Sequence, residues 1–257
     1  MGILSIESNF GKDLMSNSRI MTKTFFISLI LIILPQFSSA SVILVGTRVI
    51  YPENEKYVNL NFRSSDRVPS IIDVWVSKSI SSTENNNDAP FIVTPPIFRI
   101  DPNKGQVAKL IYNGQELPKD RESVFYLNFV QLPATDKDAN KILVTFKSSV
   151  KVFYRPKGLK EKSENISSHI EFNVDELRNG FLNISNNSEY NLTINRMSLK
   201  SNGKNLLTLV GDDINMISPF SNLEIKVKPV KNISNIDVYI DMINDLGGIS
   251  TFKIASK

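Results

Sequence analysis

The sequence contains no cysteine and only one histidine among its 257 residues. The lack of cysteine excludes disulfides, a thiol nucleophile and cysteine-based metal sites. The single histidine, His169, lies in a polar stretch, where we expect a solvated side chain rather than a catalytic imidazole. The acidic pair Asp212-Asp213 follows Gly211, a setting typical of a turn. The sequence therefore predicts a binding protein that has no metal or cofactor and is not an enzyme.

Neither positive nor negative charge is in large excess. The formal net charge is +4 over the whole chain. Without residues 1–40, 27 basic and 24 acidic residues remain, and they form no dense basic tract. Nucleic acid is therefore not an expected partner. No stretch keeps a helical period of 3.6 residues, whereas the hydrophobic content of 41% is sufficient for a packed core.

Residues 1–40 have the composition of a targeting segment. Residues 21–24 are short and basic, residues 25–34 (FFISLILIIL) are apolar, and residues 38–40 are small. This order is typical of a cleaved secretory signal peptide, and ten apolar residues are too few to span a bilayer comfortably. An uncleaved membrane anchor is the alternative. Residues 1–20 fit neither a signal peptide nor a fold, so translation starting at Met21 is the simplest explanation.

The first half of the remaining chain reads as short strands separated by turn signals. The spacing of about ten residues, with alternating apolar positions, favours an all-β sandwich of the immunoglobulin type. Two prolines interrupt the fourth pattern, which we expect to be irregular or at a sheet edge. The expected strands cover residues 42–51, 57–62, 70–79, 91–100, 106–112, 123–131 and 142–154.

A second series of strands follows a polar segment at residues 157–168, which we interpret as a linker. We place the domain boundary near Lys160, which gives an N-terminal domain at 41–160 and a C-terminal domain at 161–257. The second series is richer in Asn and alternates less clearly. Its expected strands cover residues 170–174, 180–185, 192–199, 206–209, 214–217, 222–229, 235–241 and 251–254.

The pattern at residues 142–154 is the longest predicted strand. Ile142, Val144 and Phe146 project from one face. In the simplest interpretation, they fill the core of their own domain. A second interpretation is that an edge strand of this length binds an extended segment of another protein, because its unpaired backbone groups invite pairing.

Two cations interrupt apolar sequence in the first and last strands of the N-terminal domain. Arg48 precedes Val49 and Ile50, and Lys151 lies between Val150 and Val152. If the two strands meet at one end of a sheet, Arg48 and Lys151 would form an anion site suited to a carboxylate. The alternative is two unrelated surface charges.

Three further charges lie beside core-like sequence. Glu122 and Arg155 adjoin the last two strands of the N-terminal domain, and Asp245 lies in a turn of the C-terminal domain. Charges in such surroundings usually need partners. Three separate charges at the rims of the domains are the alternative.

Five motifs together resemble the periplasmic chaperones of the chaperone–usher pathway of pilus assembly, the PapD-like family. Their order and spacing cover nearly all of residues 41–257. They are the segments 47–51 (TRVIY), 94–96 (TPP) ahead of Arg99, 117–123 (LPKDRES), 151–156 (KVFYRP) and 244–248 (NDLGG).

The resemblance implies two immunoglobulin-like domains in an L-shaped arrangement. It implies that Arg48 and Lys151 anchor the C-terminal carboxylate of a pilus subunit. It also implies that Ile142, Val144 and Phe146 fill the groove of a subunit that lacks a strand. Glu122, Arg155 and Asp245 match the interdomain ion network of the family.

The resemblance also implies a location and partners. The chaperone would work in the periplasm, bind and cap pilus subunits, and deliver them to an outer-membrane usher. The short segment between Phe129 and Ile142 resembles the short-loop class of the family. Phe146 departs from the pattern, because aliphatic residues are usual in that row. Whether the free chaperone caps itself as a dimer stays open.

One other class of protein fits the same composition. A secreted two-domain immunoglobulin-like adhesin or matrix-binding protein would also lack cysteine chemistry and would have no client subunits. A secreted hydrolase is a weaker alternative, because the sequence offers few residues for catalysis.

Overall fold

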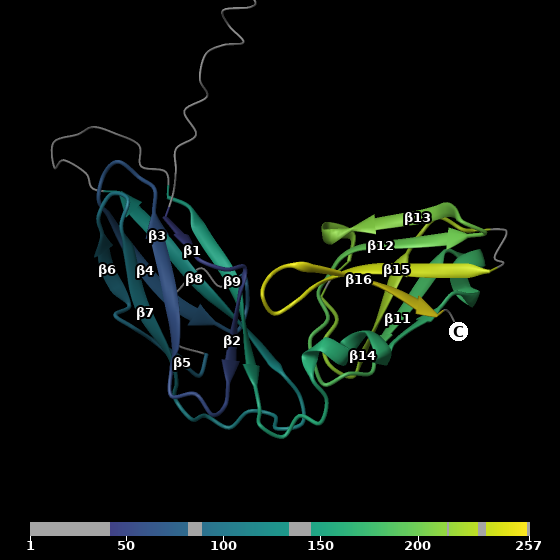
Figure 1. Ribbon diagram of the computed structural model, residues 1–257, viewed down its shortest axis with the longest axis horizontal. Coiled ribbons are helices and arrows are strands. Elements are labelled where there is room, and N and C mark those ends of the chain that lie inside the picture. Colours follow the sequence, from purple (N-terminus) through teal and green to yellow (C-terminus); the bar gives the residue numbers. More distant parts are fainter. Residues whose placement is uncertain (1–41, 82–88, 134–144, 215, 231–234, 256–257) are drawn as a thin grey trace, which may run out of the picture. The chain divides into compact units, whose positions relative to one another are not determined.

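The structure is a computed structural model, and it describes residues 42–81, 89–133, 145–214, 216–230 and 235–255. The predicted signal peptide at 1–40 lies outside these residues. Figure 1 shows strands throughout the described chain, with a few short 3-10 helices. The all-β fold class is therefore confirmed. None of the helices in the described segments is long and apolar enough to cross a membrane.

The strands of the first half form two sheets. In order of pairing, these are β1-β3-β7-β5 and β2-β9-β8-β4-β6. The strands are β1 (Val42–Leu44), β2 (Arg48–Pro52), β3 (Val58–Ser64), β4 (Ser70–Ser77), β5 (Phe91–Thr94), β6 (Ile97–Ile100), β7 (Gly105–Tyr112), β8 (Ser123–Pro133) and β9 (Lys147–Arg155).

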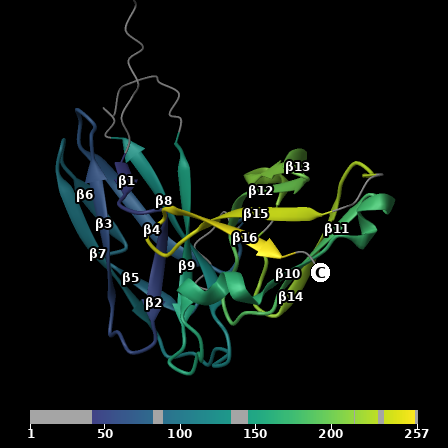
Figure 2. The same cartoon turned by 45° about the vertical axis from the view of Figure 1, so that its right-hand side comes forward.

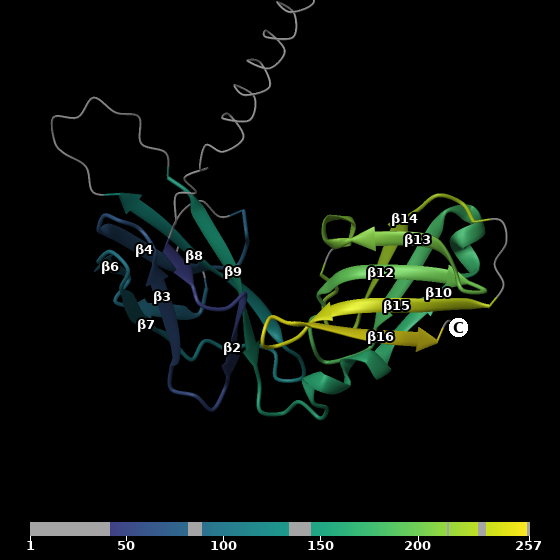
Figure 3. The same ribbon diagram turned by 45° about the horizontal axis from the view of Figure 1, so that its top comes forward.

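The second half has two smaller sheets, β10-β11-β14 and β13-β12-β15-β16. Figures 2 and 3 show these strands from two further directions. The elements are η1 (Ser163–His169), β10 (Ile170–Asn173), η2 (Asp175–Asn179), β11 (Phe181–Asn186), β12 (Ile194–Ser201), β13 (Lys204–Val210), η3 (Gly211–Asp213), β14 (Ser221–Lys226), β15 (Ile236–Ile243) and β16 (Ile249–Ala255).

Each pair of sheets encloses its own apolar core, because alternate residues of a strand point to opposite faces. In β3, Leu60 and Phe62 are buried while Asn59 and Asn61 are exposed. The Phe62 ring packs edge-on against Phe129 of the facing sheet, with ring centroids 5.3 Å apart. The second core is separate and has no residue in common with the first. Two packed sandwiches are therefore present, as predicted.

One strand prediction was wrong where the chain changes sheets. The predicted strand 42–51 is two strands in different sheets, β1 and β2, and Gly46 between them has a φ of 107°. Glycine adopts this backbone conformation without steric cost, which allows the chain to pass from one sheet to the other.

The pattern 91–100 divides at Pro95-Pro96 into β5 and β6, and each of these strands lies at the edge of its sheet. The expected irregular or edge element is therefore confirmed.

One prediction in the second half was also wrong. Among the described residues of the predicted strand 214–217, only Ile217 pairs, in an isolated bridge to Leu192. The polar segment 157–168 that we interpreted as a linker contains most of the 3-10 helix η1, which ends at His169. His169 is partly buried there, and its backbone carbonyl accepts a hydrogen bond from the backbone nitrogen of Asn187 at 2.9 Å. The boundary between 41–160 and 161–257 stays a prediction.

We expect Phe62→Ala to destabilise the first sandwich by about 3–5 kcal/mol, because it leaves a cavity among aromatic rings. Urea unfolding followed by fluorescence would test this, since Trp75 in β4 is the only tryptophan and reports on this domain. Ile92→Ala, at a position 55% exposed in β5, is the control and should cost under about 0.5 kcal/mol. Equal losses in the two variants would contradict this account of the core.

Candidate functional site

The parallel pairing of β2 with β9 brings Arg48 and Lys151 together. The two residues are direct partners in the strand register, so their side chains lie on the same face of the sheet. Both side chains are partly buried. The sequence placed these cations 103 positions apart in the first and last strands of the domain, and the structure makes them neighbours.

Arg48 is held by contacts from two directions. Its Nη1 donates a hydrogen bond to the backbone carbonyl of Ile243, at 2.9 Å. Its guanidinium lies over the ring of Phe153, 5.3 Å from the centroid. Its Nε is buried and has no hydrogen-bond partner. Arg48 is therefore fixed in place while part of its donor capacity stays unused.

The electrostatics of this pair favour an anion. Burial lowers the pKa of Lys151, and the positive charge of Arg48 lowers it further. Burial also lowers the pKa of Arg48, although Asp245 and Glu122 partly offset this effect. Within the described parts of the chain, the Lys151 side chain makes no ion pair or hydrogen bond. A bound carboxylate would relieve the repulsion between the two cations and satisfy both.

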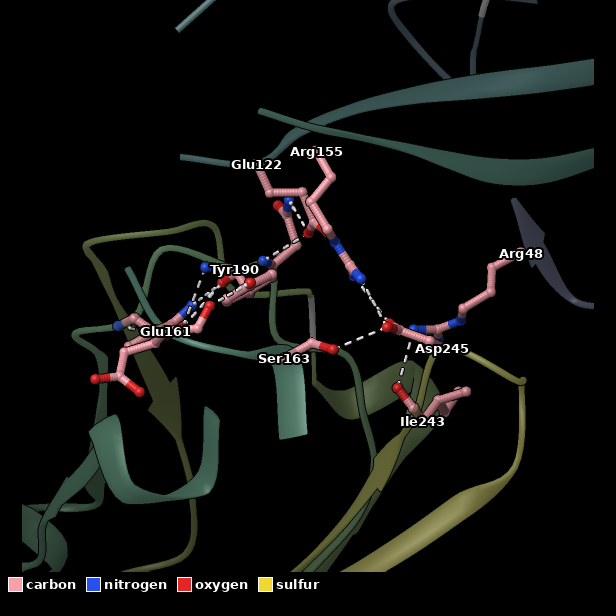
Figure 4. A network of polar contacts seen from close by, with 11 residues as sticks. Arg48, Glu122, Arg155, Glu161, Ser163, Tyr190, Ile243 and Asp245 are labelled. Carbon is pink, nitrogen blue, oxygen red and sulfur yellow. Dashed lines mark hydrogen bonds and ion pairs between the residues drawn. The ribbon is translucent and has the colours of Figure 1, made fainter. Parts of the chain in front are cut away.

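Arg155, two positions beyond Phe153 on the same face of β9, lies between two carboxylates (Figure 4). Its Nε and Nη2 donate to one oxygen of Glu122, at 3.0 and 2.9 Å. Its Nη1 and Nη2 donate to the two oxygens of Asp245, at 2.7 and 2.9 Å. The three residues that the sequence offered as candidate partners therefore form one ion network.

Neighbouring groups complete the hydrogen bonding of both carboxylates. Glu122 is 4% exposed, and its second oxygen accepts from the backbone nitrogen and the Nδ2 of Asn191, at 3.0 and 2.9 Å. Asp245 accepts from the hydroxyl of Ser163 at 2.8 Å. The ring of Tyr190 lies 5.0 Å from the Arg155 guanidinium. All of the charges in the network thus have defined partners, as buried charges require.

The two acids respond to this environment in opposite directions. Burial raises the pKa of Glu122 above its usual range, and the charge of Arg155 only partly offsets this effect. Burial also acts to raise the pKa of Asp245, but the hydrogen bonds and charge of Arg155 outweigh it and lower that pKa. For Arg155, burial acts to lower the pKa, and the two carboxylates reverse this and raise it.

Sequence reasoning missed several residues of the network. Asn191, Ser163 and Tyr190 were not singled out, and the carbonyl of Ile243 has no signature in a sequence. One signal was available in the turn after β15. Gly247 has a φ of 80°, and a Cβ at this position would collide with Thr47. The glycine of the 244–248 motif therefore allows the turn to approach β2.

A pocket of about 270 Å³ adjoins both the cation pair and the ion network. Arg48, Arg155 and Asp245 line it together with apolar side chains. The residues that supply the apolar wall are Phe153, Ile166, Leu192, Met242, Ile243, Leu246 and Phe252. In the parts of the chain that the structure describes, no cluster of three His, Cys, Asp or Glu residues could hold a metal ion.

The structure describes only part of the strand predicted at residues 142–154. Ile142 and Val144 lie outside them. Phe146 comes immediately before β9 and is 75% exposed. Alternation places it on the same face as Val150, which packs against the core, and Val152, which is buried within it. This face of the strand thus changes from buried to exposed towards Phe146.

The fold and the site define a two-domain immunoglobulin-like protein with a cation pair on one face of its five-stranded sheet. The domain model described as "Pili and flagellar-assembly chaperone, PapD N-terminal domain" matches residues 41–160. The model "Pili assembly chaperone PapD, C-terminal domain" matches residues 165–254. The chain therefore belongs to the PapD family of pilus-assembly chaperones, which are not enzymes.

Curated relatives and solved structures agree with this assignment. The probable fimbrial chaperone YadV of Escherichia coli K12 is 33% identical over 220 residues, which cover 82% of this chain and 88% of YadV. The chaperone FimB/FhaD of Bordetella pertussis is 30% identical, over 84% of this chain and 88% of its own length. The crystal structure of YadV matches with a TM-score of 0.69 at 30% identity, covering 83% of this chain and 98% of that one.

We expect Arg155→Met to lower the free energy of unfolding by about 3–5 kcal/mol near neutral pH, because Glu122 is left buried and unpaired. Arg99→Met is the matched control, since the Arg99–Asp101 pair is exposed at 64% and 59% and contributes little. Urea unfolding of wild type and both variants would measure these losses. A loss as small as that of the control would contradict the role of Arg155.

The loss caused by Arg155→Met should shrink as the pH falls. In the wild type, the lowered pKa of Asp245 adds stability above the unfolded pKa, and this stability disappears as pH falls through the folded value. Burial already raises the pKa of Glu122 in the wild type, which costs stability as pH rises above the unfolded value, and the variant loses the Arg155 charge that partly offsets this cost. Both effects make the difference larger at about pH 7 than at about pH 4. A difference independent of pH would contradict them.

Proposed function

We propose that this chaperone lends the strand from Ile142 to Lys151, which carries Ile142, Val144 and Phe146, to an incomplete pilus subunit. Arg48 and Lys151 would hold the C-terminal carboxylate of that subunit. The subunit would gain backbone partners for its unpaired strand and a cover for its exposed groove. No covalent step is involved, and a later subunit would displace the lent strand.

The cation pair carries this proposal. Two partly buried cations side by side, neither with an ion-pair partner in the described chain, are costly unless an anion joins them. A C-terminal carboxylate matches the planar fork of Arg48 and the point charge of Lys151. Because both cations lie on or beside β9, a chain end held there is in position to pair along that strand.

Phe146 is the second observation in support. Phe146 is 75% exposed directly before β9, so it is available for burial by a bound subunit. Phe146 lies on the same face of the strand as Val150 and Val152, which pack in or against the core. An incomplete immunoglobulin-like subunit needs apolar side chains spaced in this way. The adhesin alternative lacks comparable support, because the curated relatives are named as chaperones.

We further propose that the protein works in the periplasm and passes its subunits to an outer-membrane usher. The composition of residues 1–40 supports export by a signal peptide. We propose that the Glu122–Arg155–Asp245 network sets the geometry between a domain at 41–160 and a domain at 161–257. Buried ion networks of this kind specify geometry more than they add net stability.

Arg48→Ala or Lys151→Ala should abolish recovery of subunit complexes from the periplasm, because the carboxylate loses its anchor. Arg63→Ala, an exposed cation on β3 of the other sheet, is the matched control and should leave recovery unchanged. Co-purification with mass identification of the bound protein would measure this. Wild-type amounts of complex with either anchor variant would reject the assignment, provided that circular dichroism shows a folded chaperone.

Phe146→Glu and Val144→Glu should weaken subunit complexes by at least about tenfold, because each would bury an unpaired carboxylate in the groove. Val107→Glu, at a position 49% exposed on β7, adds the same charge on the other sheet and serves as the control. Competition between tagged variants and wild type for one subunit would give the ratio. Unchanged affinity for the first two variants would rule out the lending strand.

A further inference from the structure

The pocket beside Arg48 has an unusual combination of walls. One side is apolar, formed by side chains such as Leu192, Met242 and Phe252. Arg48 and Thr193 add polar side chains to the lining. Their Nε and Oγ1 atoms are buried and have no hydrogen-bond partner among the described residues.

The rim of the pocket is also apolar. Leu246 lines the pocket, yet it is 94% exposed. Its turn is rigid, because Asn244 Oδ1 accepts hydrogen bonds from the backbone nitrogens of Leu246 and Gly248, at 3.1 and 2.9 Å. Asp245 in the same turn is fixed by Arg155. A large aliphatic side chain held out beside a pocket in this way is suited to covering an apolar group that enters it.

The charged side chains around the pocket limit which chemical groups it could bind. Glu122 and Asp245 line it but are paired with Arg155, so Glu164 is the negative charge of the lining that would disfavour a guest with a negative side chain. The anion site of Arg48 and Lys151 adjoins the pocket through Arg48, which belongs to both. A guest with a carboxylate at one end and a large uncharged group beside it matches this arrangement.

We propose that the pocket receives the last side chain of the bound subunit while the terminal carboxylate lies on Arg48 and Lys151. This inference rests on the proposed function and adds a preference to it: the last residue of the client carries a large, uncharged side chain. Arg48 Nη1 is already occupied by the Ile243 carbonyl.

N-acetyl amino acids are direct probes, because each presents one side chain next to a free carboxylate. N-acetylphenylalanine and N-acetylleucine should bind at least about tenfold more tightly than N-acetylglycine, since they bury apolar area in the pocket. N-acetylglutamate should show no such gain. The amide of N-acetylphenylalanine should not bind. Titration of the whole chaperone followed by methyl NMR would show shifts at Met242 and Leu192 with the large probes only.

Two variants test the position of the pocket. Leu246→Ala removes the apolar rim from an exposed turn, and Thr193→Phe fills the space. Both should reduce the preference for N-acetylphenylalanine over N-acetylglycine. Ile249→Ala is the matched control, because Ile249 is 59% exposed on the adjoining β16 but does not line the pocket. It should keep the full preference.

The outcomes separate this inference from the proposed function. Equal binding of all the N-acetyl amino acids, lost in Arg48→Ala, would overturn the pocket and keep the carboxylate anchor. Binding that survives Arg48→Ala, or no binding of any carboxylate, would overturn both. A preference for the large side chains that Leu246→Ala and Thr193→Phe leave intact would also overturn the pocket.

Discussion

The pairing of β2 with β9 is the constraint on which the site depends. It is parallel, whereas the other strand pairs described in the same sandwich are antiparallel. It sets Arg48 directly beside Lys151 without an acid between them. The chain gains nothing in stability from two like charges that are partly buried, so their place in the fold is best explained by a ligand. Alternation along β9 then places Phe153 and Arg155 on the same face of the strand as Lys151.

Arg155 links this face to the second sandwich. Its carboxylate partners are Glu122, directly before β8 in the first sandwich, and Asp245, in the turn after β15. Asn191 donates hydrogen bonds to Glu122, and Ser163 donates one to Asp245. Arg48 makes a parallel link through the carbonyl of Ile243. The cation that we propose to bind the client therefore also contacts the second sandwich.

The regular parts of the fold were predictable because burial follows simple alternation. In β15 each second residue from Ile236 to Met242 is apolar and buried, as are Leu60 and Phe62 in β3, and both strands lie close to the expected bounds. The prediction of one strand over 42–51 failed because the chain changes direction at Gly46 and divides the apolar pattern between two sheets. The sequence at 214–217 is apolar enough for a strand, but of its described residues only Ile217 pairs.

The strand content, the two cores and the charged candidates could be predicted from the residues alone, because side-chain alternation and exceptions to it are local properties. The five motifs also indicated the family. Which candidates meet could not be predicted in this way, because neighbours such as Arg48 and Lys151, or Arg155 and Asp245, depend on strand register and on turns far apart in the chain. The contributions of the Ile243 carbonyl, the unpaired Arg48 Nε and the exposed Leu246 are likewise visible only in the folded chain, since backbone position and burial have no signature in a single residue type.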